Sequence, residues 1–180
     1  MYFTTEGSDN TVQTVELAIK TARERNIKHI VVATNTGATA RLLKNCTGLQ
    51  IVCVTHANGT RKSGENELTA EMRAELLNCG MQVLTTTHVL SGAERGISRK
   101  FGGINPVELM AHTLRMFGQG TKVGVEIAVM ALDAGLIPFG QPVIAIGGTG
   151  RGADTALILT PAHANNIFDT RIHEVICKPV

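Results

Sequence analysis

The sequence contains no tryptophan, and only 3% of its 180 residues are aromatic. Proteins that bind single-stranded nucleic acids stack bases on aromatic rings, and this chain has few rings to offer. An excess of charge is also lacking, because 17 Lys and Arg against 15 Asp and Glu leave a net charge of +2. Neutralising a phosphate backbone requires a concentrated basic surface, so we expect no nucleic-acid partner.

The four cysteines form no C-x-x-C pair and lie mostly in apolar runs, where Cys acts as a small hydrophobic residue. The longest apolar stretch, residues 123–139, is interrupted by Glu126 and Asp133, so we expect no membrane-spanning segment. The N-terminal residues lack the basic and apolar regions of a secretion signal. These absences predict a reduced, cytoplasmic protein, and the spacing of its six histidines predicts no metal site.

Hydrophobic residues make up 43% of the chain, enough to bury a core, and we expect one domain over residues 1–180. Continuous apolar runs at 30–33, 51–54 and 81–84 are typical of strands buried on both faces of a parallel sheet. Helical patterns precede and separate these runs, and we expect helices at about 10–25, 38–45 and 67–79. This alternation predicts an α/β fold with helices on both sides of the sheet.

The alternation ends after the third strand. Residues 87–104 are polar and glycine-rich, which predicts a long loop. Asn105 as a cap, Pro106 at the first position and Glu108 after them predict a helix to about Phe117, and a nearly all-apolar helix follows from 121 to about 134. We expect three further strands, at 143–146, 155–159 and 172–177. Because the connection between the first two is too short for a helix, they should be antiparallel neighbours.

A polar turn follows the first strand and opens a helix: Thr34, Asn35, Thr36, Gly37, Ala38, Thr39 and Ala40. The first amides of a helix lack intrahelical acceptors and lie at the positive end of the helix dipole, so anions bind there. Thr36 and Thr39 add hydroxyl donors. The turn also lies at the carboxyl end of a strand, where open α/β sheets bind ligands, so we favour an anion site over a plain helix cap.

A second glycine-rich segment contains Gly148, Thr149, Gly150, Arg151 and Gly152. It matches G-x-G-x-x-A, but a dinucleotide fingerprint must open a helix, and here a strand-like run follows, so we reject that interpretation. Two interpretations remain. The segment is either an anion-binding nest of backbone amides with an arginine, or a tight turn whose glycines supply positive φ.

The predicted loop at 87–104 carries the densest group of cations, accompanied by hydroxyls: Ser91, Arg95, Ser98, Arg99 and Lys100. Such a group is able to neutralise a phosphate, although a solvated surface loop has the same composition. Glu126 and Asp133 lie seven residues apart on one face of an apolar helix. They are the candidates for acid–base catalysis if buried, and otherwise they lie at the helix edge or pair with a loop cation.

The turn Thr34–Ala40 resembles the T-x-[ST]-G-x-[ST]-A turn of the pyruvate kinase C-terminal domain, and the segment 150–155 is similar to the glycine-rich loop near that domain's end. The order of elements agrees over most of the chain. The resemblance implies a three-layer α/β/α fold with a mostly parallel mixed sheet and one antiparallel strand. It implies no kinase activity, because the catalytic barrel is absent and Ala38 replaces the usual arginine of the turn.

The chain is more similar to free-standing, mostly archaeal and bacterial members of this superfamily, some of which have been seen with flavin mononucleotide (FMN). This resemblance implies an FMN phosphate at the turn, with Ser91–Gly103 and Gly148–Gly152 lining the rest of the ligand. Our leading hypothesis is therefore a binding protein for a phosphorylated small molecule. The alternatives are a flavin-dependent or phosphosugar-type enzyme and a regulatory sugar-phosphate sensor, and a homo-oligomer is left open.

Overall fold

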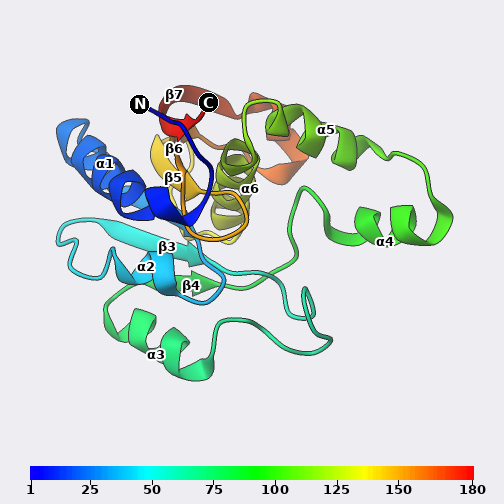
Figure 1. The fold of residues 1–180 in the computed structure, drawn as a ribbon, viewed down its shortest axis with the longest axis horizontal. Helices are drawn as coiled ribbons and strands as arrows, with labels where there is room; N and C mark the ends of the chain where they lie inside the picture. Colours follow the sequence, from blue (N-terminus) through cyan, green and yellow to red (C-terminus); the bar gives the residue numbers. More distant parts are fainter.

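The computed structural model describes all of residues 1–180 and contains one seven-stranded sheet (Figure 1). The order of strands across the sheet is β1-β7-β6-β5-β2-β3-β4. Neighbouring strands are parallel except on both sides of β6, which alone runs against the others. The strands are β1 (Tyr2–Phe3), β2 (His29–Ala33), β3 (Gln50–Val54), β4 (Gln82–Leu84), β5 (Val143–Gly147), β6 (Thr155–Thr160) and β7 (Arg171–Pro179).

Helices cover both faces of the sheet and form the two outer layers of a three-layer fold. The helices are α1 (Thr11–Glu24), α2 (Ala38–Arg41), α3 (Ala70–Asn78), α4 (Gly92–Phe101), α5 (Pro106–Arg115) and α6 (Gln119–Asp133), with 3₁₀ turns η1 (Ser8–Asn10) and η2 (Ala164–Asp169). Helices α1, α2 and α3 share one hydrophobic core with the sheet, and α6 shares the other. Helix α5 packs on α6.

Strand β2 contributes side chains to both hydrophobic cores, one on each face of the sheet. Its side chains alternate, so Ile30 and Val32 join the core under α1, and Val31 joins the core under α6. All three are fully buried. A continuous apolar run is therefore needed here, because each face of the strand is covered by helices.

The structure confirms the predicted fold class and most of the predicted elements. The strands expected at 30–33, 51–54 and 81–84 are β2, β3 and β4, and each runs parallel to its neighbour. The hairpin expected from the short connection is also present, since β5 and β6 pair antiparallel from Val143↔Leu159 to Gly147↔Thr155. Helix α6 lies buried against the sheet, as its apolar composition predicts.

The prediction of a loop at residues 87–104 is wrong, because residues 92–101 form α4. Two glycines and many polar residues hide the helical pattern. Contacts outside the helix hold it instead: the Glu94 carboxylate accepts the N–H groups of Val107 and Glu108, at 3.2 and 2.8 Å, in the first turn of α5. The structure confirms Asn105 at the N-cap position of α5, followed by Pro106, but the Asn105 side chain caps no amide of the helix, and its amide group donates to Ser98 Oγ at 2.8 Å.

Strand β1 gave no recognisable pattern in the sequence because it is only two residues long. It pairs parallel with β7 at the sheet edge, and the amino group of Met1 donates to the Ile176 carbonyl at 2.7 Å. None of the helices in the fold combines the length and the apolar character needed to cross a membrane.

Candidate functional site

The carboxyl ends of four parallel strands meet at one edge of the sheet. Residues Ala33 of β2, Val54 of β3 and Leu84 of β4 are in register, and β5 is in register with β2 on the other side. The segments that follow these strands are therefore neighbours, and the Thr34–Ala40 turn lies next to the Gly148–Gly152 loop. In Figure 1 the arrowheads of β3 and β4 point toward the side that carries α4 and the long connection after β3.

The Thr34–Ala40 turn presents free backbone donors. Gly37 has a left-handed φ of +93°, and its N–H donates to Thr34 Oγ1 at 3.1 Å. The N–H groups of Ala38 and Thr39 donate to no group of the chain. Ala38 is exposed to solvent, whereas Thr39 is buried.

Gly37 itself is explained by packing. A Cβ at this position would lie 2.3 Å from Met72 Cγ of α3, and its left-handed φ disfavours a side chain. The glycine thus lets α3 close over the turn, and it does not by itself indicate a ligand.

The Gly148–Gly152 loop is shaped by Asp154, a fully buried residue that the sequence analysis did not single out. Its carboxylate accepts the N–H groups of Gly7 and Thr149, at 3.0 and 3.1 Å, and the hydroxyl of Thr155 at 2.7 Å. These bonds fix the loop against the segment before α1. The amides of Gly148, Gly150 and Gly152 nevertheless donate to no group of the chain.

The cations of α4 are not gathered at one place. Helix α4 packs on α5 and projects from the body of the molecule, as Figure 1 shows. Arg99 and Lys100 are exposed near its end, and the Lys100 ammonium lies 5.4 Å from the ring of Phe101. Arg95 and Ser91 instead line a cavity of about 170 Å³ together with Arg115 of α5.

Glu126 is buried, with 2% of its surface exposed, and three groups surround its carboxylate. The Lys122 ammonium lies 2.5 Å from Oε2, the Leu90 N–H donates to Oε1 at 2.9 Å, and His88 Nδ1 lies 3.7 Å from Oε2. Burial is the largest influence on Lys122 and lowers the pKa of its ammonium, although the charge of Glu126 opposes this effect. Burial likewise lowers the pKa of His88.

Asp133, the second predicted carboxylate, has a structural position. It lies 2.8 Å from His163 Nδ1 and accepts the N–H of Ala164 at 3.3 Å. This contact ties η2 to the end of α6. The structure thus separates the two carboxylates, since only Glu126 lies near the loops at the carboxyl edge of the sheet.

Two histidines that the sequence analysis did not single out lie beside this edge. His56 follows β3, and its Nδ1 lies 2.9 Å from the Glu67 carboxylate, which also accepts from Arg61 Nε at 2.9 Å. His88 follows β4, and its ring centroid lies 5.7 Å from that of His56. Their positions just after predicted strands were visible in the sequence. The partner of His88, Glu126, comes from the distant helix α6, and Glu67 lies in the same connection as His56.

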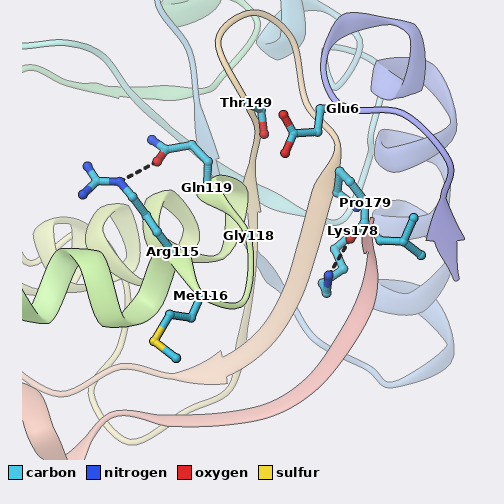
Figure 2. Close-up of a pocket in the computed structure, with 9 residues that line it drawn as sticks. Glu6, Arg115, Met116, Gly118, Gln119, Thr149, Lys178 and Pro179 are labelled. Atoms are coloured by element: carbon cyan, nitrogen blue, oxygen red, sulfur yellow. Dashed lines mark hydrogen bonds between the residues drawn. The ribbon is translucent and has the colours of Figure 1, made fainter.

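Two cavities border these segments, and both are small. The larger, about 210 Å³, lies between the α5–α6 junction and the C-terminal residues, and Figure 2 shows Glu6 and Thr149 beside each other at one end of it. Of the predicted site residues it contains only Thr149. Pockets that enclose a ligand of drug size usually measure roughly 300–1,000 Å³, so neither cavity encloses such a ligand.

The chain resembles solved structures of pyruvate kinase from Cryptosporidium parvum. Two of them, one in complex with ADP, are 19% and 18% identical over 82% of this chain, each with a TM-score of 0.41. A third is 16% identical over 91% of the chain, with a TM-score of 0.38. The chain spans only 22% of the length of each of these kinases.

The family described as "Pyruvate kinase, alpha/beta domain" matches residues 13–159, which include every strand from β2 to β5 and nearly all of β6. The match covers well over half of the 180 residues, and it includes both the Thr34–Ala40 turn and the Gly148–Gly152 loop. The chain therefore belongs to the pyruvate kinase alpha/beta domain family.

Proposed function

We propose that this chain is a cytoplasmic binding protein for a phosphorylated small molecule, held by its phosphate between the Thr34–Ala40 turn and the Gly148–Gly152 loop. The observation that carries this proposal is the set of free donors on two adjacent loops. The amides of Ala38 and Thr39 on one loop and of Gly148 and Gly150 on the other have no acceptor in the chain. A phosphate offers several acceptor oxygens and a negative charge, which suits such a set.

FMN is the first ligand to test, because the chain resembles free-standing members of this superfamily, some of which have been seen with FMN. The residues of the two loops fit its phosphate. They offer less to its ring, because both cavities are small and lined mainly by polar residues. None of the phenylalanines lines either cavity. The proposal therefore depends on the phosphate more than on the flavin.

The test compares FMN with riboflavin, which carries the same ring without the phosphate. Dissociation constants are measured by fluorescence titration of the purified protein. We expect FMN to bind and the double variant Thr36→Val/Thr39→Val to bind it at least about tenfold more weakly, a loss of about 1.4 kcal/mol from missing hydroxyl donors.

Thr47→Val is the matched control, because Thr47 is exposed beyond α2 and outside the turn. The phosphate assignment is contradicted if riboflavin binds as tightly as FMN, or if the double variant and the control give equal dissociation constants. Binding of sugar phosphates without FMN would retain the phosphate site and reject the flavin.

A further inference from the structure

His56 has the geometry of an oriented base. Its Nδ1 lies 2.9 and 3.1 Å from the two oxygens of the Glu67 carboxylate. A carboxylate only accepts hydrogen bonds, so in the neutral ring Nδ1 carries the proton and Nε2 keeps its lone pair. Nε2 forms no hydrogen bond within the chain, and the side chain is 28% exposed, so the lone pair is accessible.

The chain also places His56 beside the proposed phosphate site. Val54, two residues earlier, pairs with Ala33, which directly precedes the Thr34–Ala40 turn. His56 and Asn35 of the turn therefore follow adjacent strands at the same distance from the strand ends. A ligand held by its phosphate at the turn would extend over His56 if it crosses from β2 toward β3.

An arginine is linked to the residue before His56. Arg73 of α3 donates to Thr85 Oγ1, which lies 2.7 Å from Oγ1 of Thr55. The Arg73 guanidinium forms no salt bridge, whereas Arg61 is paired with Glu67. The two hydroxyls hold Arg73 close to the end of β3, on the face of the sheet that α3 covers.

We propose that His56 is a general base acting on a phosphorylated α-hydroxy carbonyl compound, with Glu67 as its positioning residue. This inference rests on the proposed phosphate site and adds a reaction and a substrate class to it. Imidazole is a weak base that removes a carbon-bound proton only where a neighbouring carbonyl acidifies it. The need for an acidified C–H bond therefore points to a carbonyl compound as the substrate. The proposed anion site at the Thr34–Ala40 turn points to a substrate that carries a phosphate.

The proposed step is a proton transfer. His56 Nε2 takes the proton on the carbon beside the carbonyl, the C–H bond breaks, and its electron pair forms the C=C bond of an enediolate. The carbonyl oxygen gains the negative charge. The imidazolium then returns a proton to the same carbon, so the step needs no oxidant, reductant or second substrate.

The experiment follows exchange of carbon-bound hydrogen in D₂O. Dihydroxyacetone phosphate and ribulose 5-phosphate are incubated with the protein, and loss of the proton signal beside the carbonyl is measured by NMR. We expect exchange above the buffer rate, a fall of at least about 100-fold in His56→Gln, and no change in the control His112→Gln, whose side chain is exposed on α5.

Glu67→Gln is tested in the same way. A second measurement distinguishes a role in positioning His56 from a role in stability alone. Nitrogen-15 spectra of the imidazoles report which ring nitrogen carries the proton. We expect His56 to be protonated at Nδ1 in the natural protein and to become a mixture of tautomers in Glu67→Gln, with exchange reduced about tenfold or more.

The same samples separate this inference from the proposed function. Shifts of the Ala38 and Thr39 amide signals report phosphate binding at the turn. If these amides shift but no exchange occurs, the base is refuted and the phosphate site stands. If neither sugar phosphate moves the amides, the proposed function fails for this substrate class, and the inference falls with it.

Discussion

At the residue scale, the contribution of the Lys122–Glu126 ion pair to stability depends on its burial. Both side chains are almost completely buried, with 6% and 3% exposed. A buried ion pair is weak support for stability, because taking both charges out of water offsets much of their attraction. Removing one partner, however, leaves a buried charge without compensation. The carboxylate also receives the Leu90 N–H, which links α6 to the segment before α4.

We expect Lys122→Met to lower the free energy of unfolding by about 3–5 kcal/mol, because Glu126 keeps a buried charge and loses its partner. The double variant Lys122→Met/Glu126→Gln should lose much less, since glutamine is neutral and still accepts from Leu90. Urea denaturation monitored by circular dichroism measures both variants. A double variant as unstable as the single one would show that the cost comes from packing and not from the charge.

At the scale of elements, α4 and α5 depend on each other. Residues 92–101 contain two glycines and few apolar residues, so intrinsic preference predicts little helix. Glu94 instead supplies the acceptor that the first turn of α5 lacks, while Ser98 accepts from Asn105. A helix cap normally comes from the preceding residue. Here it comes from the neighbouring helix, which local sequence patterns do not reveal.

The Glu94 contact is tested by Glu94→Ala. We expect a loss of about 1–2 kcal/mol in the free energy of unfolding, the usual effect of removing a cap, and faster hydrogen exchange at the amides of Val107 and Glu108. Arg99→Ala is the control, because Arg99 is exposed on the same helix and has no acidic partner within 4.0 Å. Equal exchange rates in the two variants would mean that Glu94 does not cap α5.

At the scale of the whole molecule, α6 approaches the sheet so closely that glycine is required. A Cβ on Gly120 would lie 2.1 Å from Thr155 Oγ1 and 2.9 Å from Asp154 Oδ1, and a Cβ on Gly147 would lie 2.4 Å from the Gly120 carbonyl oxygen. This contact joins the start of α6 to the β5–β6 hairpin. It therefore brings the buried Lys122–Glu126 pair to the same edge of the sheet as the Gly148–Gly152 loop.

Two glycine substitutions should change the free energy of unfolding in opposite directions, and the first of them tests the packing of α6. Gly120→Ala should lower the free energy of unfolding by about 1–3 kcal/mol, because the added methyl group forces α6 away from β6. Gly96→Ala should raise it by up to about 1 kcal/mol, because Gly96 lies in α4 with no atom within 4 Å of an added Cβ. Thermal and urea denaturation measure both. A Gly120→Ala variant as stable as the natural protein would contradict the close approach.

The sequence by itself determined the fold class, since apolar runs such as 30–33 and 51–54 have the length and composition of strands covered on both faces. It also determined that the threonine-rich turn and the glycine-rich loop follow strands, and that β5 and β6 form a hairpin. These features depend on neighbouring residues along the chain.

Only the tertiary structure decided which side chains meet at the sheet edge. The pairing of β2 with β5 placed the two predicted loops side by side, although they lie far apart in the sequence. Packing of α6 and of the long connection after β3 brought carboxylates to His88 and His56. Such partners come from long-range packing, and no local periodicity encodes them. The sequence therefore predicted which turn and which loop follow the strands, and the fold decided which side chains meet at that edge of the sheet.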